Sequence, residues 1–423
     1  MMLALSLAFA GPLELHHVLE GLEGRHPKME AARAKQDVAD AALLARRGAF
    51  DPTLHGKASA YGGKYVRDHV DVGVRTQTIL GPAVTLGYTR GTGDIPEYAG
   101  DTATGPLGEL VGRLEVPLLK DLGLGKDRAE LQVARIGRTT AEAALGDTVR
   151  VLRRDAGAKY WDWVAAGMDL RVAEEQLRLA ERRAAALERQ VQEGTKAPMD
   201  QLDNERVLEE RRAKMASARE KLEVKALALS LYVRGDDGAP VVPAAEALPE
   251  TWPQVAALPE DQHVEDAPDA RPDLAALRAQ VDAAIVKQRA SGNALLPDLR
   301  VTGAAIQPLD TGLKHELVAG VSVKAPLAFR EGLGERRMAD AYVAALQAEQ
   351  RLAEDTVRAE VEAALVSRRR AEERAEAARR GAERAEDVLA LERRRYALGG
   401  SDLFQLLQRE DALAKARSLA VEA

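Results

Sequence analysis

Two long stretches without proline constrain this chain more than any other feature. Gly125 and Gly194 enclose one stretch and Gly334 and Gly399 the other, spanning 69 and 65 residues in a chain with 18 prolines. Apolar residues recur there with heptad spacing, as at Leu170, Leu177, Ala184 and Val191. At 1.5 Å per residue, each stretch could form a helix of roughly 100 Å. Such a helix cannot bury itself in a compact domain, so we expect it to pack against copies of itself.

The chain also contains an internal duplication. Residues 25–54 align without gaps to 270–299 at an offset of 245, with Pro27 matching Pro272. Two later matches follow in the same order: Pro117 with Pro326 at an offset of 209, and Gly194 with Gly399 at an offset of 205. One unit of about 200 residues has therefore been used twice.

The duplication predicts two repeats with the same element order. The first repeat, 11–233, is expected to hold a helix at 13–48, strands within 52–118, and long helices at 126–193 and 197–232. The second repeat, 269–423, is expected to hold a helix at 270–293, strands within 297–327, and long helices at 335–398 and 402–423. The segment 234–268 contains six prolines and is predicted to be an extended connector. The last helix would end roughly 15 residues before the position that matches the end of its partner helix.

The predicted strands alternate apolar and polar residues. In 315–325, Leu317, Ala319 and Val321 share one face, while Glu316 and Ser322 lie on the other. This pattern suits a strand between lipid and a water-filled lumen, and equally a strand half buried in a soluble sheet. The first repeat has an additional alternating hairpin at 70–90, which could either join the sheet or project from it.

Composition excludes several classes of protein. The 60 basic and 67 acidic side chains give a net charge of -7, which argues against a nucleic-acid-binding protein. The absence of cysteine excludes disulfides, thiolate metal sites and a cysteine nucleophile. The sequence contains no run of 18 apolar residues, so no transmembrane helix is predicted. Residues 1–10 end in Ala8-Phe9-Ala10 and are predicted to be a signal peptide; a mis-assigned start codon or a buried helix are the alternatives.

No constellation of residues indicates an enzyme, a metal site or a cofactor site. The neighbours His16 and His17 point to different helix faces and cannot make the three or four ligands of a zinc site. Gly125-Lys126 superficially resembles a phosphate-binding loop, but the required spacing is absent and Glu335 replaces the lysine in the second repeat. The arginine runs are interleaved with glutamate, as on a solvated helix surface.

The order of several motifs resembles the TolC-like outer-membrane factors, the outer membrane efflux proteins of Gram-negative bacteria. The resemblance rests on the repeat starts RHPKMEAARA and ARPDLAALRA, the strand-to-helix segments EVPLLKDLGLGKDRAEL and KAPLAFREGLGERRMAD, and GAKYWDWVAA. The turn segments RQVQEGTKAPMDQL and RRYALGGSDLFQLL complete it. It covers almost the whole chain.

The resemblance implies an α+β membrane protein: a homotrimer with a shared β-barrel in the outer-membrane lipid and an α-barrel of long helices across the periplasm. It implies a passive exit duct of a tripartite efflux or type I secretion system, working with a periplasmic adaptor and an inner-membrane transporter of the ABC or RND type. The family has two strands per half, which gives four per protomer and twelve per trimer. The rival interpretations are a soluble coiled-coil scaffold, periplasmic or cytoplasmic, and an enzyme with a helical stalk.

The resemblance also implies roles for the two helix-to-helix turns. These turns would form the periplasmic tip that meets the adaptor; they comprise Gly194, Thr195, Lys196, Pro198, Gly399, Gly400, Ser401 and Asp402. Carried over from the family by spacing, the residues of a candidate tip gate are Asp200, Asp203, Tyr396, Gln405 and Gln408. Asp200 has an alternative interpretation as a solvated acid at a helix start, where the helix dipole favours it.

Overall fold

The computed structural model describes residues 11–63, 65–94, 103–254, 264–310, 312 and 314–423. It divides into two compact units. One comprises Met1–Ala31, Gly146–Ala270 and Thr356–Ala423, and the other comprises Ala32–Leu145 and Arg271–Asp355. Each unit therefore contains parts of both repeats. The predicted signal peptide and part of the predicted connector, 255–263, lie outside the described residues.

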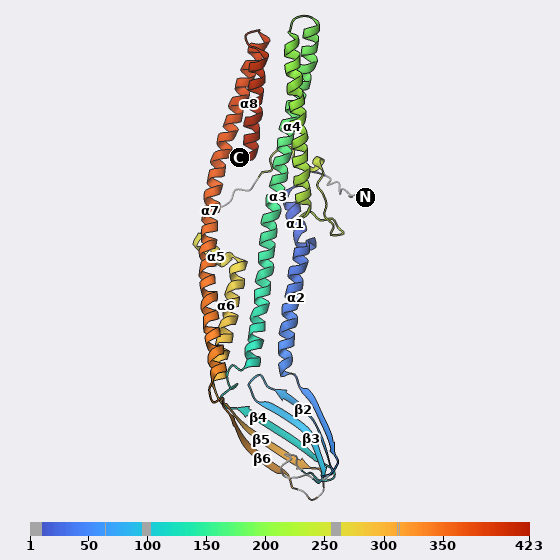
Figure 1. Ribbon diagram of the computed structural model, residues 1–423, viewed down its shortest axis with the longest axis vertical. Coiled ribbons are helices and arrows are strands. Elements are labelled where there is room, and N and C mark those ends of the chain that lie inside the picture. The colour runs from blue at the N-terminus through green and yellow to red at the C-terminus, as the bar shows by residue number, and fades with distance from the viewer. Residues whose placement is uncertain (1–10, 64, 95–102, 255–263, 311, 313) are drawn as a thin grey trace. The chain divides into compact units, whose positions relative to one another are not determined.

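The second unit contains a six-stranded antiparallel sheet whose strands are neighbours in chain order (Figure 1). The strands are β1 (Thr53–Tyr61), β2 (Arg67–Gln77), β3 (Ala83–Gly93), β4 (Glu109–Pro117), β5 (Asp298–Pro308) and β6 (Glu316–Lys324). Strand β4 of the first repeat pairs with β5 of the second. The additional hairpin of the first repeat, β2 and β3, is part of this sheet.

A tight turn connects β2 to β3. The backbone N–H of Thr78 donates to the Pro82 carbonyl at 2.8 Å, and the N–H of Gly81 donates to the Thr78 carbonyl at 3.0 Å. Gly81 has a φ of +116°, a conformation that residues with a Cβ rarely adopt. The Gly81-Pro82 pair thereby fixes where the two strands begin to pair.

Helix α6 (Pro272–Ser291) packs on the first part of α7 (Arg330–Ala397) in the same unit. Val281 and Ala284 of α6 form a buried cluster with Val343 and Leu346 of α7. Beside the sheet, two side chains link the repeats. The Asn293 side chain donates to the Asp121 carboxylate at 2.9 Å and accepts the Asp121 N–H at 3.0 Å.

The first unit contains α1 (Leu15–Arg25) and most of two helical hairpins, whose long helices begin in the second unit. One hairpin joins α3 (Lys126–Gln192) to α4 (Pro198–Ser230), and the other joins α7 to α8 (Leu403–Glu422). Trp163 and Tyr160 of α3 are fully buried. The Tyr160 hydroxyl donates to the Leu13 carbonyl at 3.0 Å, which ties the segment before α1 to α3.

The prediction of one helix over 13–48 is wrong at His26. The structure has α1, then His26 in an extended conformation, then α2 (Pro27–Arg47) and a 3-10 turn at Gly48–Phe50. Pro27 lacks an N–H and disfavours helical geometry in the residue before it. The His26 Nδ1 accepts the Lys28 N–H at 3.1 Å, so this side chain caps the second helix.

Candidate functional site

The sheet presents one continuous apolar face. Directly paired residues of an antiparallel sheet point to the same side. One such row crosses all six strands and contains Leu54, Val74, Leu86, Gly112, Ala305 and Leu317. Two neighbouring rows are also apolar, and they contain Val84, Leu114, Gly303 and Ala319, and Val116, Val301 and Val321.

Most of these apolar residues are exposed within the described part of the chain, while Val84 and Val116 are half-buried. The exposed fraction is 77% for Leu54, 64% for Leu86 and 81% for Leu317. An exposed apolar surface that crosses six strands is far more than the scattered apolar residues of an ordinary protein surface. It requires a cover that this unit of a single chain does not supply.

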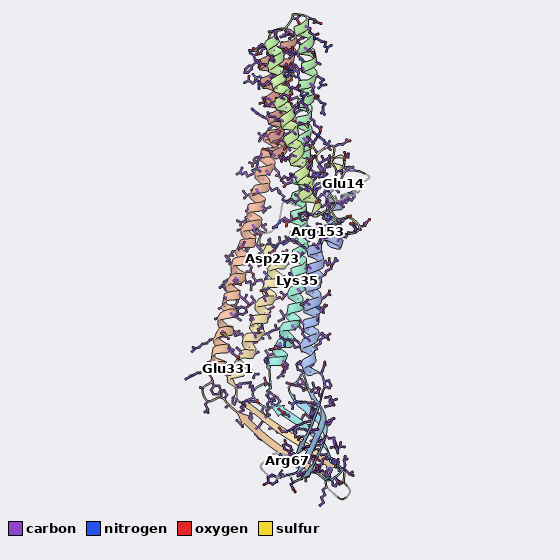
Figure 2. The ribbon with its side chains drawn as sticks, turned by 45° about the vertical axis from the view of Figure 1, so that its right-hand side comes forward. Glu14, Lys35, Arg67, Arg153, Asp273 and Glu331 are labelled. Atoms are coloured by element: carbon purple, nitrogen blue, oxygen red, sulfur yellow. The ribbon has the colours of Figure 1, made fainter. Side chains whose placement is uncertain are left out.

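The opposite face of the same sheet is polar and charged. Arg75 lies 3.3 Å from Glu115, and Arg300 lies 2.7 Å from the same carboxylate. Between β1 and β2, His55 lies 3.2 Å from Asp71. Arg67, labelled in Figure 2, is at the start of β2, and its guanidinium lies 4.0 Å from the centre of the Tyr61 ring. A sheet with one apolar and one charged face can separate hydrocarbon from water.

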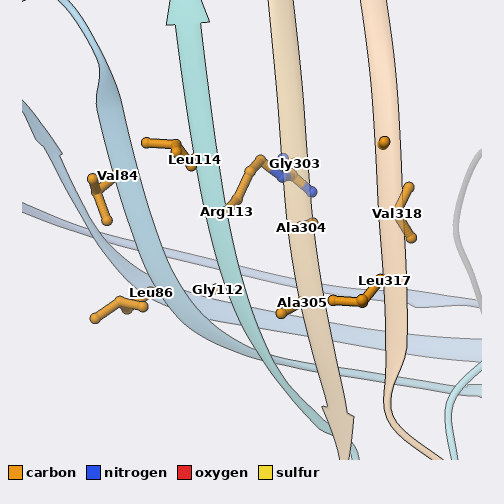
Figure 3. Close-up of a pocket in the computed structure, with 11 residues that line it drawn as sticks. Val84, Leu86, Gly112, Arg113, Leu114, Gly303, Ala304, Ala305, Leu317 and Val318 are labelled. Carbon is orange, nitrogen blue, oxygen red and sulfur yellow. The ribbon is translucent and has the colours of Figure 1, made fainter.

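The apolar face contains a shallow hollow of about 480 Å³. Small residues of β4, β5 and β6, including Gly112, Gly303 and Ala319, form its floor. Larger side chains such as Leu86 and Leu114 surround them (Figure 3). Apart from Arg113, the hollow is lined by apolar residues, so it could receive a hydrocarbon chain.

The turn between α3 and α4 has a compact hydrogen-bonded geometry. Gly194 has a φ of +74°, and its N–H donates to the Val191 carbonyl at 3.0 Å. The N–H groups of Thr195 and Lys196 both donate to the Gln190 carbonyl, at 2.9 and 3.2 Å. Pro198 begins α4, where its missing N–H has no helical partner to lose.

The turn between α7 and α8 repeats this design with other side chains. Gly399 has a φ of +77°, and the Gly400 N–H donates to the Arg395 carbonyl at 2.9 Å. The Asp402 carboxylate caps α8 by accepting the Gln405 N–H at 2.8 Å. The Ser401 hydroxyl donates to Glu392, whose side chain is buried.

The structure brings these two turns into contact. The Lys196 ammonium lies 5.0 Å from the centre of the Tyr396 ring, in the geometry of a cation–π interaction. Tyr396 packs against the buried cluster of Leu389, Leu406 and Leu413. The two hairpins therefore meet at the turns that were predicted to form one tip.

The other candidate gate residues occupy less distinctive positions. Asp200 is half-exposed in the first turn of α4, and its N–H donates to the Ala197 carbonyl at 3.0 Å. Asp203, Gln405 and Gln408 are exposed. The Gln405 side chain lies 3.1 Å from the Ser401 hydroxyl, so this residue belongs to the turn that caps α8.

The sequence prediction missed a set of ion pairs between the two hairpins. Arg183 of α3 pairs with Glu410 of α8, whose side chains are 13% and 5% exposed. Arg417 of α8 lies 2.5 Å from Glu175 of α3. One sign was visible in the sequence: the buried residues of α8 are Leu403, Leu406, Glu410 and Leu413, so Glu410 has the spacing of a core residue.

Asp411 lies in a groove between α3, α4 and α8, with three cationic side chains around it. Lys415 lies 2.7 Å from this carboxylate, Arg211 3.4 Å and Lys214 3.8 Å. Burial would raise the pKa of Asp411, but the hydrogen bond from Lys415 and the charges of Lys214 and Arg211 hold it below its usual value. Asp411 is thus an ionised contact between α4 and α8.

The described residues contain no cluster of three or more histidine, aspartate or glutamate side chains that could hold a metal ion. His16 pairs with Glu14 at 3.1 Å. None of the described helices is both long enough and apolar enough to cross a bilayer.

Residues 264–423 match the family described as outer membrane efflux protein. No curated protein matches the chain.

Solved structures of outer-membrane proteins share the fold over nearly the whole chain. The MtrE outer membrane channel of Neisseria gonorrhoeae is 18% identical with a TM-score of 0.70, and 96% of this chain aligns with 85% of that one. VceC of Vibrio cholerae is 17% identical with a TM-score of 0.69, covering 96% of this chain and 92% of that one. The CmeC channel of Campylobacter jejuni is 16% identical with a TM-score of 0.67, covering 96% and 82%.

Proposed function

We propose that this chain is an outer membrane efflux protein and forms the trimeric exit duct of a tripartite efflux or type I secretion system. The match of residues 264–423 to that family and the fold shared with solved outer-membrane proteins support the proposal. Its sheet would lie in the outer membrane and its helices would extend into the periplasm. The duct would be passive and would carry whatever its inner-membrane transporter, of the ABC or RND type, delivers.

The observation that carries this proposal is the two-faced sheet. Leu86 on one face is exposed, while Arg75 and Glu115 pair on the other. In water, each Å² of apolar surface left exposed costs about 25 cal/mol relative to the same surface buried, so the apolar face disfavours a soluble monomer. In lipid, the same face is favourable and the charged face lines a water-filled lumen.

The two glycine turns support contact with a periplasmic adaptor. They are the ends of two helical hairpins, and the contact between Lys196 and Tyr396 holds them side by side. Thr195, Gly399 and Gly400 are exposed and available to a partner. The gate would lie at the same tip, with Tyr396 and Asp200 as its central residues and Asp203, Gln405 and Gln408 near them.

The rival functions explain less of the structure. A soluble coiled-coil scaffold would explain the ion pairs and heptads of α3 and α7. It would not explain an exposed apolar face on all six strands. An enzyme with a helical stalk would need a reactive constellation, and the hollow on the sheet is lined by glycine, alanine, valine and leucine with one arginine.

The proposal is tested by a photoreactive amino acid at Thr195, introduced into the protein in bacterial cells. We expect adducts to a periplasmic adaptor, identified by mass spectrometry. The matched control places the same group at Glu223, which is also exposed on α4 but lies away from the turn. Equal labelling of the adaptor from both positions, or labelling from Glu223 alone, would contradict contact at the tip.

A further inference from the structure

The six-stranded sheet has two edge strands that pair on one side only. Within the described residues, β1 pairs with β2 and β6 pairs with β5, and neither has a second neighbour. All nine residues of β6 are exposed, and so are eight of the nine in β1. Neither edge strand contains proline. Without proline to block pairing, each edge leaves a row of backbone N–H and C=O groups without hydrogen-bond partners. Hydrocarbon does not tolerate such groups.

The two edges are suited to each other. Each is nine residues long. Five successive antiparallel pairings separate them, so they run in opposite directions, and β6 of one copy beside β1 of the next would continue the antiparallel order. Small residues occupy the apolar side of β1, at Gly56, Ala58 and Ala60, where the apolar side of β6 carries larger residues such as Leu317 and Val321.

Hairpin β2–β3 belongs to the same wall. All eleven residues of β2 pair with all eleven of β3, and β3 pairs in turn with β4. The hairpin also continues the apolar face: Val74 is 43% exposed and Leu86 is 64% exposed, in one row with Leu54 and Leu317. If this hairpin projected into water, its apolar side would have no cover.

We propose that β1 of one copy pairs with β6 of the next, so that three copies close a sheet of 18 strands. The number of copies rests on the trimeric duct proposed above. The family arrangement of four strands per copy gives twelve. This chain therefore forms a duct of larger circumference, with hairpin β2–β3 as an additional segment of its wall.

The additional strands set the width of the opening. With strands about 4.8 Å apart and tilted by roughly 40°, twelve strands give a backbone radius of about 12 Å and 18 strands give about 18 Å. The cross-section enclosed by the backbone thus grows a little more than twofold, into the range of sheets that surround an aqueous channel. The solutes that this end of the duct passes can be correspondingly larger.

The test uses the absence of native cysteine. Lys57 of β1 is changed to cysteine together with one residue of β6, giving Lys57→Cys with Val318→Cys, Gly320→Cys or Ser322→Cys. These three positions share the polar face, so a register shift by two residues is covered. A Cβ at Gly320 would meet no other atom within 4 Å.

The matched control is Lys57→Cys with Thr302→Cys. Thr302 is the direct partner of Gly320 on β5, one strand further from the edge. Because a disulfide cannot form between Cα atoms more than about 7 Å apart, mild oxidation should give at least about tenfold more covalent trimer in one of the β6 pairs than in the control. Cross-linking by Lys57→Cys alone would show that β1 meets β1 and would overturn the proposal.

Electron cryo-microscopy of the detergent-extracted oligomer provides the second measurement. We expect a trimer whose closed sheet has 18 strands. A trimer with twelve strands and hairpin β2–β3 outside the wall would overturn this inference and leave the proposed function standing. A particle that is not a trimer would overturn both.

Discussion

A charge placed on the apolar face of the sheet tests whether that face meets lipid. Leu86 lies near the middle of β3 and is 64% exposed, with Val74 and Gly112 as its paired neighbours. On a water-facing surface, Leu86→Arg would change the free energy of unfolding by no more than about 0.5 kcal/mol. At the middle of a bilayer, an arginine on the lipid face destabilises by about 2–4 kcal/mol. We therefore expect Leu86→Arg to lower the folding equilibrium constant by roughly 30-fold to nearly 1,000-fold.

The matched control is Thr89→Arg on the same strand. Thr89 points to the opposite face, where its direct partners are Asp71 and Glu109, so a new arginine there has carboxylates beside it. Reversible urea unfolding of the protein in lipid vesicles measures both variants. If Leu86→Arg is no more destabilising than Thr89→Arg, the apolar face does not meet lipid.

Three further predictions concern the helices. Burial, then the charges of Arg234 and Lys28, lower the pKa of His26, whose neutral Nδ1 caps α2. The contribution of His26 to stability should therefore be complete above about pH 6.5 and lost as the pH falls through its folded-state pKa. Thermal unfolding of His26→Asn should lack this pH-dependent component. Glu410→Gln leaves Arg183 buried without its carboxylate and should lower the unfolding free energy by about 3–5 kcal/mol. Asp387→Asn, in the exposed pair with Arg384, should change it by less than about 1 kcal/mol. Similar losses in the two variants would contradict the argument from burial. Gly399→Ala, at a φ of +77°, should destabilise the protein by about 1–2 kcal/mol. Gly381→Ala lies within α7, where a Cβ meets nothing within 4 Å, and should stabilise it by about 0.5–1 kcal/mol. Denaturation midpoints of the two variants that move in the same direction would contradict this prediction.

Local features of the sequence predicted much of the helical architecture. Long intervals without proline and heptads of alanine and leucine correspond to α3 and α7, which contain 67 and 68 residues. The glycines at 194 and 399 end these helices because each adopts a positive φ. These features depend on a few neighbouring residues, so one sequence suffices to find them.

Features that depend on distant residues were harder to predict. The alternation around Val74 and Leu86 indicated a hairpin, but whether β3 pairs with β4 depends on contacts that no short window contains. The break at His26 had a local sign in Pro27, which the repeating alanines on either side obscured. The pair of Arg183 and Glu410 joins residues separated by 227 positions, and only its core-like spacing in α8 hinted at it.

The most direct test of the central claim is the mass of the detergent-extracted oligomer, measured together with its distribution between inner and outer membranes. We expect a trimer of the 45.6 kDa chain in the outer-membrane fraction. A monomer or dimer in the soluble fraction would contradict the duct and favour the coiled-coil scaffold.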